Sequence, residues 1–564
     1  MPTSNAFGFA PADWLLALLT VSFIFAAFGW NPAIQRAFTA LAGNTRVCML
    51  LLFLLPIALR LLLLPHHPVP TPEIYDEFSH LLVADTLLHG RLANPPHPLP
   101  QFFETFFELQ WPTYSSIYPL GQGIVLAAGR LISGVPWTGV LMVTGTFCGL
   151  CYWMLRGWVT PVWALLGGLL AVIQFGPLNL WMNSYWGGGL AAAGGCLVFG
   201  ALPRLLGHWR TRHAVLLAIG FVAHMLARQF ESVLLFAVIV LFFLPSFLRG
   251  ETRPKFLRAS LVTVCAVLPG IALILLQNRA ITHSWITLPE QLSRYQYGVP
   301  ASLTIESNPL PHVTLTPQQE LDYKAQSLMH GPGDDTLPKF LLRLEYRVRY
   351  YRFFFLPPLY IALFAFFFAL RNRRLLWVAA TLIIFSLGTN LFPYLLVHYL
   401  AAVTCLFILV SVTGLQQLGR LKIRGTRVGI EIVRVLVLLC MAEFACWYGL
   451  HLFETPAAYS VLRYETWDAI EGTRQQRRIE VKRQLAAISG ELLVFVRYSP
   501  HHIYQDEWVW NAADIDTSRI VYARDLGPDE DERLIEHFPT RKLLLLEPDE
   551  SPPRISPFNH APGK

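Results

Sequence analysis

Two adjacent carboxylates, Asp76 and Glu77, follow shortly after a strongly apolar run from Cys48 to Pro65. His80 and Asp85 come next, at spacings that fit one short helix. A carboxylate that is partly removed from water has a raised pKa and can act as a general base on a hydroxyl group. The alternative is structural: Asp76 caps the helix and Glu77 is solvated, and these residues alone leave both interpretations open.

A second pair of charges, Arg228 and Glu231, lies in HMLARQFES, between two apolar segments. An unpaired charge at such a helix end is costly and is usually functional. An arginine suits a phosphate, because its guanidinium group can bind two oxygens at once. A local ion pair between Arg228 and Glu231 is the structural alternative.

Polar and aromatic side chains occur at two further segment ends. Asn183, Tyr185 and Trp186 lie in NSYWGG, and His398 and Tyr399 lie in PYLLVHYLAA. They offer hydrogen-bond donors to a phosphate or sugar and aromatic faces to a sugar ring. An interfacial aromatic belt and a satisfied core histidine explain the same residues equally well.

The elements that carry these residues are predicted to be membrane helices. The 564 residues are 54% hydrophobic and only 14% charged, which is far from the balance of a soluble domain. Apolar windows long enough to cross a bilayer recur about twelve times, so we predict a mainly α, polytopic helical bundle. The windows are Trp14–Trp30, Cys48–Leu64, Trp137–Leu155, Pro161–Met182, Gly187–Leu202, Ala214–Ala227, Ser232–Leu248, Ala259–Leu276, Phe353–Leu370, Leu375–Leu391, Tyr394–Leu415 and Val428–Leu452.

Lys and Arg residues predict the orientation, because cytoplasmic loops carry them in excess. They cluster in four alternate connections, 204–212, 249–258, 371–374 and 420–427. The other connections, including the long loops 65–136 and 278–351, are then expected outside, together with the N-terminus. The net charge of +7 lies largely in the cytoplasmic loops and suits anionic lipids, so no nucleic-acid partner is expected.

The last part of the chain, 453–564, is charged and has only short apolar runs. ELLVFVRY, SRIVYARDL and KLLLLEP alternate with helical stretches. This pattern predicts a small soluble α/β domain with a few parallel strands, outside the membrane. The first 452 residues are expected to form the membrane domain.

Several motifs resemble one known family. YDEFSHLLVADTLLHGRLANPPHP, YPLGQG, WMNSYWGGG, ARQFES and VHYLA, with the tail VRYSPHHIYQDEWVWNAADID, look like a bacterial branch of the GT-C superfamily. That superfamily of polyprenyl-phosphate-dependent membrane glycosyltransferases includes the protein mannosyltransferases and the lipid A aminoarabinose transferase. The resemblance implies a GT-C-like fold, a bacterial inner membrane and an external active site.

The resemblance also implies roles for individual residues. Asp76, with Glu77 beside it, matches the acidic residue that serves as the base. Arg228 and Glu231 match a motif that more often reads Arg-Pro-Tyr-Glu-Gly, and His398 and Tyr399 match a His-Tyr that is commonly followed by Ala-Ala-Pro. The chain differs from the first motif at the residues between and after the Arg and the Glu, and no proline follows the second motif.

The expected reaction is an in-line, inverting transfer of a hexose or pentose from a polyprenyl-phosphate donor to an external hydroxyl. Asp76 would take the hydroxyl proton, and Arg228, with His398, would hold the leaving phosphate. His80 and Asp85, with Glu77, would shape the acceptor site or, with Asp76, hold a divalent cation. The expectation leans toward no cofactor.

Two other functions remain open at this point. A transporter or flippase of lipid-linked sugars would share the hydrophobicity, although no repeated halves are found. A scaffold or receptor would use the soluble tail and would tolerate the loss of Asp76. The sugar, the acceptor (a lipid, polysaccharide or protein), the prenyl length and the oligomeric state do not follow from the sequence.

Overall fold

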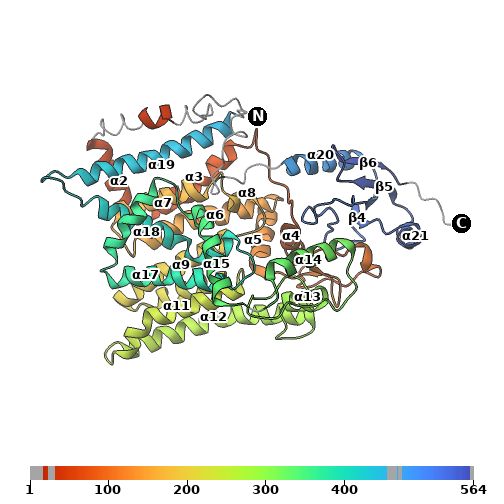
Figure 1. Ribbon diagram of the computed structural model, residues 1–564, viewed down its shortest axis with the longest axis horizontal. Helices are drawn as coiled ribbons and strands as arrows, with labels where there is room; N and C mark the ends of the chain where they lie inside the picture. The colour runs from red at the N-terminus through yellow and green to blue at the C-terminus, as the bar shows by residue number, and fades with distance from the viewer. Residues whose placement is uncertain (1–16, 23–31, 334, 454–466, 468–472, 559–564) are drawn as a thin grey trace.

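The chain folds into a helical bundle joined to a C-terminal α/β unit (Figure 1). This computed structural model describes residues 17–22, 32–333, 335–453, 467 and 473–558. The bundle contains α2 (Pro32–Gly43), α3 (Thr45–Leu62), α6 (Trp137–Leu155), α7 (Pro161–Phe175), α8 (Leu180–Asn183), α9 (Gly189–His208), α10 (Thr211–Met225), α11 (Gln229–Leu248), α12 (Arg253–Thr282), η2 (Val348–Phe354), α16 (Leu359–Phe366), η3 (Phe367–Ala369), α17 (Arg373–Thr389), η4 (Val397–Val403), α18 (Thr404–Leu418) and α19 (Val428–Leu452). The predicted fold class is confirmed.

Two insertions interrupt the bundle, and most of their helices lie at the end of the bundle that faces the C-terminal unit (Figure 1). The first contains α4 (Tyr75–Leu88), η1 (Pro100–Phe102), the short strands β1 (Glu108–Leu109) and β2 (Ser115–Ser116), and α5 (Leu120–Ser133). The second contains α13 (Pro289–Tyr297), α14 (Pro317–His330) and α15 (Leu337–Arg347). They correspond to the two long loops that the sequence predicts.

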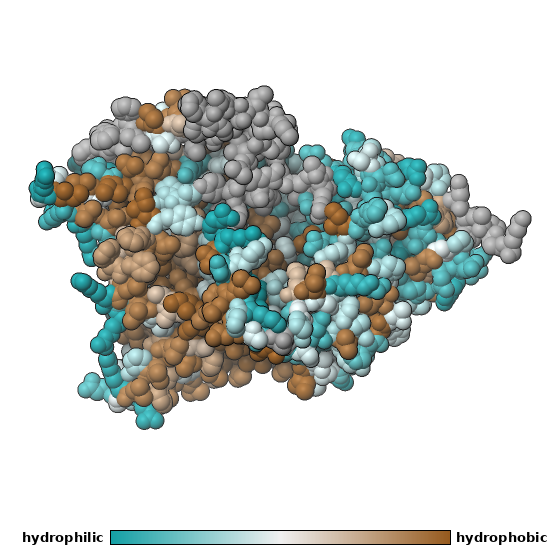
Figure 2. Space-filling view, in the orientation of Figure 1, coloured by the Kyte–Doolittle hydropathy of each residue, from teal (hydrophilic) through white to brown (hydrophobic). Residues whose placement is uncertain are grey.

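The bundle has the length and apolar surface of a membrane domain. Within the described residues, six helices are long and apolar enough to cross a bilayer, or seven if the bent pair Leu337–Phe354 and Leu359–Ala369 is one span. Three shorter apolar helices are α5, α7 and α10. Figure 2 shows hydrophobic residues over the bundle and hydrophilic residues over the other half of the molecule. The chain is therefore a multi-pass membrane protein.

Each predicted window from Cys48 onward overlaps a helix, and the windows Trp137–Leu155 and Val428–Leu452 coincide with α6 and α19. Most of Trp14–Trp30 lies outside the described residues. Two windows differ from one continuous helix. The window Pro161–Met182 is interrupted between α7 and α8, and Phe353–Leu370 is divided at Pro357 and Pro358, which lack the amide hydrogens that a helix requires.

The C-terminal unit is a four-stranded sheet with the order β4-β3-β5-β6. Strands β3 (Leu492–Val496), β4 (Ile520–Arg524) and β5 (Lys542–Glu547) are parallel, whereas β6 (Arg554–Pro557) is antiparallel to β5. The helices are α20 (Thr473–Ala487) and α21 (Pro528–His537). The central strand β3 is buried along its whole length, which explains its uninterrupted apolar sequence LLVFV. The predicted parallel strands are confirmed.

The C-terminal unit and the first insertion share one hydrophobic core. Leu82 of α4, together with Phe102 and Phe103, is buried in the same cluster as Leu493 and Phe495 of β3. The C-terminal unit is thus packed directly against α4, the helix that carries the predicted catalytic residues.

Candidate active site

The beginning of α4 is held in place by Glu77. One carboxylate oxygen of Glu77 accepts hydrogen bonds from the backbone amides of Glu73 (2.8 Å) and Ile74 (3.4 Å), and the other accepts one from the amide of Tyr185 (2.8 Å). Glu77 therefore connects the first turn of α4 to the NSYWGG segment. Its oxygens are used in positioning the helix, and burial raises its pKa to about 7.

Helix α5 brings Tyr118 to α4. Gly121 donates its amide to the carbonyl of Leu226, 2.8 Å away, at the end of α10. A Cβ atom at Gly121 would lie 2.6 Å from that carbonyl oxygen, and a Cβ atom at Gly123 would lie 2.2 Å from a methyl carbon of Val83 on α4. The two glycines of YPLGQG thus permit α5 to approach both α10 and α4 closely.

Asp76 lies buried where these helices meet, with 7% of its surface exposed. The Tyr118 hydroxyl donates a hydrogen bond to Asp76 Oδ1, and the Trp186 side chain lies close enough to the carboxylate to favour its ionised form. Burial raises the pKa of Asp76 to about 6, although the hydrogen bond from Tyr118, the positive charge of Arg228 and the nearby Trp186 side chain oppose the shift. Asp76 is therefore ionised at neutral pH and still basic enough to take a proton.

Arg228 lies beside Asp76 with its guanidinium group available. The group lies over the ring of Tyr399, 5.1 Å from the ring centroid. It makes no hydrogen bond or ion pair with any residue that the structure describes. The alternative of a local Arg228–Glu231 ion pair is thus not found. Glu231 is buried, and its Oε1 has no hydrogen-bond partner among the described residues.

Two histidines complete the surroundings of Asp76. His398 is buried with its ring against Trp186 (5.0 Å between centroids), and its Nε2 has no hydrogen-bond partner among the described residues. His80 is also buried and lies over the ring of Tyr118, with the ring centroids 4.2 Å apart. The structure therefore brings together six of the residues named from the sequence, namely Asp76, His80, Trp186, Arg228, His398 and Tyr399.

Asn183 and Tyr185 use their polar atoms within the protein. Asn183 accepts a hydrogen bond from the buried guanidinium of Arg60 (2.6 Å) and donates to the carbonyls of Pro177 and Asn179 (2.9 Å each). The Tyr185 hydroxyl donates to the carbonyl of Pro70 (2.9 Å). Both residues hold the NSYWGG segment in position, and Trp186 is the member of this motif that contacts Asp76.

Asp85 lies at the other end of α4, away from Asp76. It accepts a hydrogen bond from Arg130 of α5 (2.6 Å) and one from the backbone amide of Ala513 in the C-terminal unit (2.8 Å). Asp85 therefore joins three parts of the molecule, and the structure does not bring it to the other predicted site residues.

Two residues near Asp76 received no role from the sequence. Tyr118 lies in YPLGQG, a motif that signalled family resemblance without indicating that its tyrosine would contact Asp76. Asp322, in α14 of the second insertion, is buried, receives hydrogen bonds from Gln326 (3.1 and 3.0 Å) and lies within electrostatic reach of Asp76. Burial, with the negative charge of Asp76, raises the pKa of Asp322 to about 7. It lies in a polar helix without any motif that could have indicated it.

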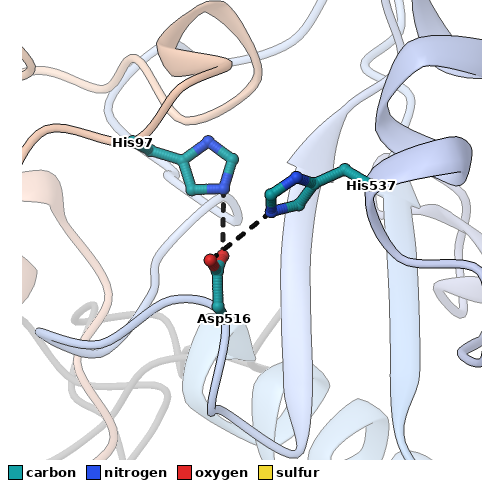
Figure 3. Close-up of side chains that lie close together, drawn as sticks. All are labelled: His97, Asp516 and His537. Carbon is teal, nitrogen blue, oxygen red and sulfur yellow. Dashed lines mark hydrogen bonds and ion pairs between the residues drawn. The ribbon is translucent and has the colours of Figure 1, made fainter.

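His97, Asp516 and His537 form a separate cluster between the first insertion and the C-terminal unit (Figure 3). His97 Nε2 lies 3.0 Å from one Asp516 oxygen, and His537 Nε2 lies 3.4 Å from the other. The amide of Leu99 donates to His97 Nδ1 (2.9 Å), so the proton of a neutral His97 is on Nε2 and points to Asp516. These contacts form a hydrogen-bonded bridge between the two parts.

Comparison with solved structures finds similar proteins. ArnT from Cupriavidus metallidurans, in the apo state and bound to undecaprenyl phosphate, matches with a TM-score of 0.47 and 12% identity over 88% of this chain and 92% of ArnT. The Archaeoglobus fulgidus oligosaccharyltransferase in its apo form matches with a TM-score of 0.37 and 11% identity over 80% of this chain and 62% of its own. No protein-family model and no curated protein sequence matches the chain.

Proposed function

We propose that the protein is an integral-membrane glycosyltransferase that transfers a hexose or pentose from a polyprenyl-phosphate donor to a hydroxyl group. The observation that carries this proposal is the buried Asp76 beside the guanidinium of Arg228, which makes no hydrogen bond or ion pair with the residues that the structure describes. This displacement requires a base for the acceptor hydroxyl and a cation that binds the leaving phosphate.

In the proposed reaction, Asp76 takes the proton of the acceptor hydroxyl as its oxygen forms a bond to the anomeric carbon. The bond between that carbon and the phosphate oxygen breaks, and the lipid phosphate leaves with the electron pair. Arg228 and His398 hold the phosphate, and the anomeric configuration is inverted. Tyr118 orients the carboxylate of Asp76 through its hydrogen bond, and Trp186 lies beside it.

We place the site and the C-terminal residues 453–564 on the external face of a bacterial inner membrane. The basic connections of the bundle support this orientation, since the turns between α11 and α12 and between α18 and α19 lie at the end of the bundle away from α4 (Figure 1). The mechanism needs no resident cofactor. Transfer should therefore persist in excess EDTA, whereas abolished transfer that Mg²⁺ or Mn²⁺ restores would show that a divalent cation takes part.

The decisive experiment measures sugar transfer in vesicles that contain the full-length protein and a panel of polyprenyl-phosphate sugars. Asp76→Asn should reduce kcat by about 100-fold or more, the scale of general-base catalysis. Asp529→Asn, at an exposed carboxylate of α21, serves as the control and should have wild-type activity.

Retained activity in Asp76→Asn would contradict the mechanism. If the wild type transfers no sugar but moves lipid-linked sugars across the vesicle membrane, the protein is a flippase and the proposal fails.

A further inference from the structure

The candidate active site contains a buried histidine to which the mechanism above assigns no role. His80 follows Asp76 by one helical turn, so both side chains lie on the same face of α4. Only 5% of its surface is exposed, and its ring lies over the Tyr118 ring at an interplanar angle of 30°. Neither ring nitrogen has a hydrogen-bond partner among the described residues.

The unpaired nitrogens of His80 define what a ligand must supply. Burial and the positive charge of Arg228 lower the pKa of His80 to about 3, so the imidazole is neutral at pH 7. A neutral imidazole has one N–H donor and one acceptor nitrogen. Buried polar groups are normally paired, and an unpaired one costs about 1–3 kcal/mol. A matching ligand offers one hydrogen-bond acceptor next to one donor.

The neighbours of His80 indicate the charge of that ligand. Arg228 is close enough to influence His80, and both lie within electrostatic reach of His398. The guanidinium of Arg228 and the Nε2 of His398 also lack hydrogen-bond partners among the described residues. Three nitrogen-bearing side chains with one positive charge between them suit an anionic oxygen better than a cation.

A sugar phosphate diester meets both requirements of His80, because a phosphate oxygen accepts a hydrogen bond and a neighbouring sugar hydroxyl donates one. We propose that His80 binds the donor substrate, donating its imidazole N–H to a phosphate oxygen and accepting a hydrogen bond from a sugar hydroxyl. This inference rests on the proposed function and assigns the donor phosphate a third binding residue, one that carries no charge.

The test measures the binding of undecaprenyl phosphate, as the probe, to the purified full-length protein in nanodiscs. His80→Phe keeps a ring over Tyr118 but removes both nitrogens, and it should weaken binding about 10-fold or more. His80→Gln keeps a neutral donor and acceptor and should bind within about threefold of the wild type.

His213→Phe is the matched control. His213 is buried and has an unpartnered Nδ1, but it lies in the first turn of α10, whereas Arg228 follows the last turn, roughly 22 Å away along the helix. This variant should bind undecaprenyl phosphate like the wild type. Equal weakening in His80→Phe and His213→Phe would overturn the inference, since it would reflect a general effect of the substitution.

The hydroxyl contact is tested with a sugar donor that supports transfer. His80→Phe should raise the KM for this donor by a larger factor than it raises the Kd for undecaprenyl phosphate, because the sugar contact is lost as well. If the KM rises by an equal or smaller factor than the Kd, the proposed contact between His80 and the sugar hydroxyl is wrong.

Failure of this inference and failure of the proposed function give different patterns. Wild-type affinity in His80→Phe together with weakened binding in Arg228→Gln would overturn the role of His80 alone. No binding by the wild type, or wild-type affinity in Arg228→Gln, would overturn the proposed function and the role of His80 with it.

Discussion

Two opposing effects determine the pKa of the Asp76 carboxylate. Burial favours its neutral form, whereas Tyr118, Trp186 and Arg228 favour the ionised form. Since the resulting pKa is about 6, the carboxylate is mostly ionised at pH 7, and it is a stronger base than an ordinary aspartate.

This balance predicts the pH dependence of transfer. The pKa of Asp76 is raised to about 6, and only the ionised form accepts a proton, so kcat/KM should fall as the pH decreases below about 6 and level off above it. A pH–rate profile between pH 4.5 and 8.5 measures this limb. A profile that stays flat down to pH 5 would contradict Asp76 as the base.

Replacing Tyr118 tests whether its hydrogen bond lowers the pKa of Asp76. Tyr118→Phe removes a hydrogen bond that favours the ionised carboxylate, so the limb should move to higher pH and the rate at pH 6 should decrease. The exposed Tyr295 provides the control Tyr295→Phe, whose profile should match the wild type. A limb that does not move in Tyr118→Phe would exclude this tyrosine from tuning Asp76.

The residues around Asp76 also show how far residue types can predict a site. The sequence analysis selected Asp76, Arg228 and His398 because charged or titratable groups near a membrane are costly unless they have a function. Glu77, Asn183 and Tyr185 have equally suitable side chains, but their polar atoms are used by backbone groups and by Arg60. Whether a donor or acceptor is already paired depends on tertiary contacts that no local pattern reports.

At the scale of elements, long apolar windows predicted the spanning helices because bilayer thickness sets a minimum length. Helix α5 is apolar but has only 14 residues, so its sequence remained within a predicted external loop. The contact that makes α5 important, between Gly121 and Leu226, joins residues far apart in the chain. Such a contact follows from the packing of helices and could not be read from periodicity.

The close approach of α5 to α10 predicts the effect of a single methyl group. Gly121→Ala would place a Cβ atom 2.6 Å from the Leu226 carbonyl oxygen, so α5 must shift and displace Tyr118 from Asp76. We expect kcat to decrease about 10-fold or more, the loss that a small misplacement of a catalytic group produces. Gly207→Ala on α9 meets no atom within 4 Å and should leave kcat unchanged.

In the molecule as a whole, the C-terminal unit packs against α4, the helix that carries Asp76, and holds it in position. The indole N–H of Trp510 donates to the carbonyl of Phe78 (3.2 Å), and Ala513 donates its amide to Asp85. Arg478 donates to the carbonyl of Glu73, 3.1 Å away, just before α4. The C-terminal unit therefore contacts α4 near both of its ends, which implies that it takes part in orienting the active site.

Loss of the Trp510 contacts should make α4 more mobile while the bundle stays folded. Trp510→Ala removes the hydrogen bond to Phe78 and the contact between the two rings, whose centroids lie 5.4 Å apart. Hydrogen exchange of the α4 amides should accelerate, because local opening needs less free energy when packing is lost, and kcat should fall with it. Arg533→Ala, at an exposed ion pair of α21, is the control and should change neither measurement. If Trp510→Ala lowers kcat without changing hydrogen exchange in α4, the C-terminal unit affects the reaction by another route. Faster exchange in α4 with full activity would show that the orientation of α4 does not limit the rate.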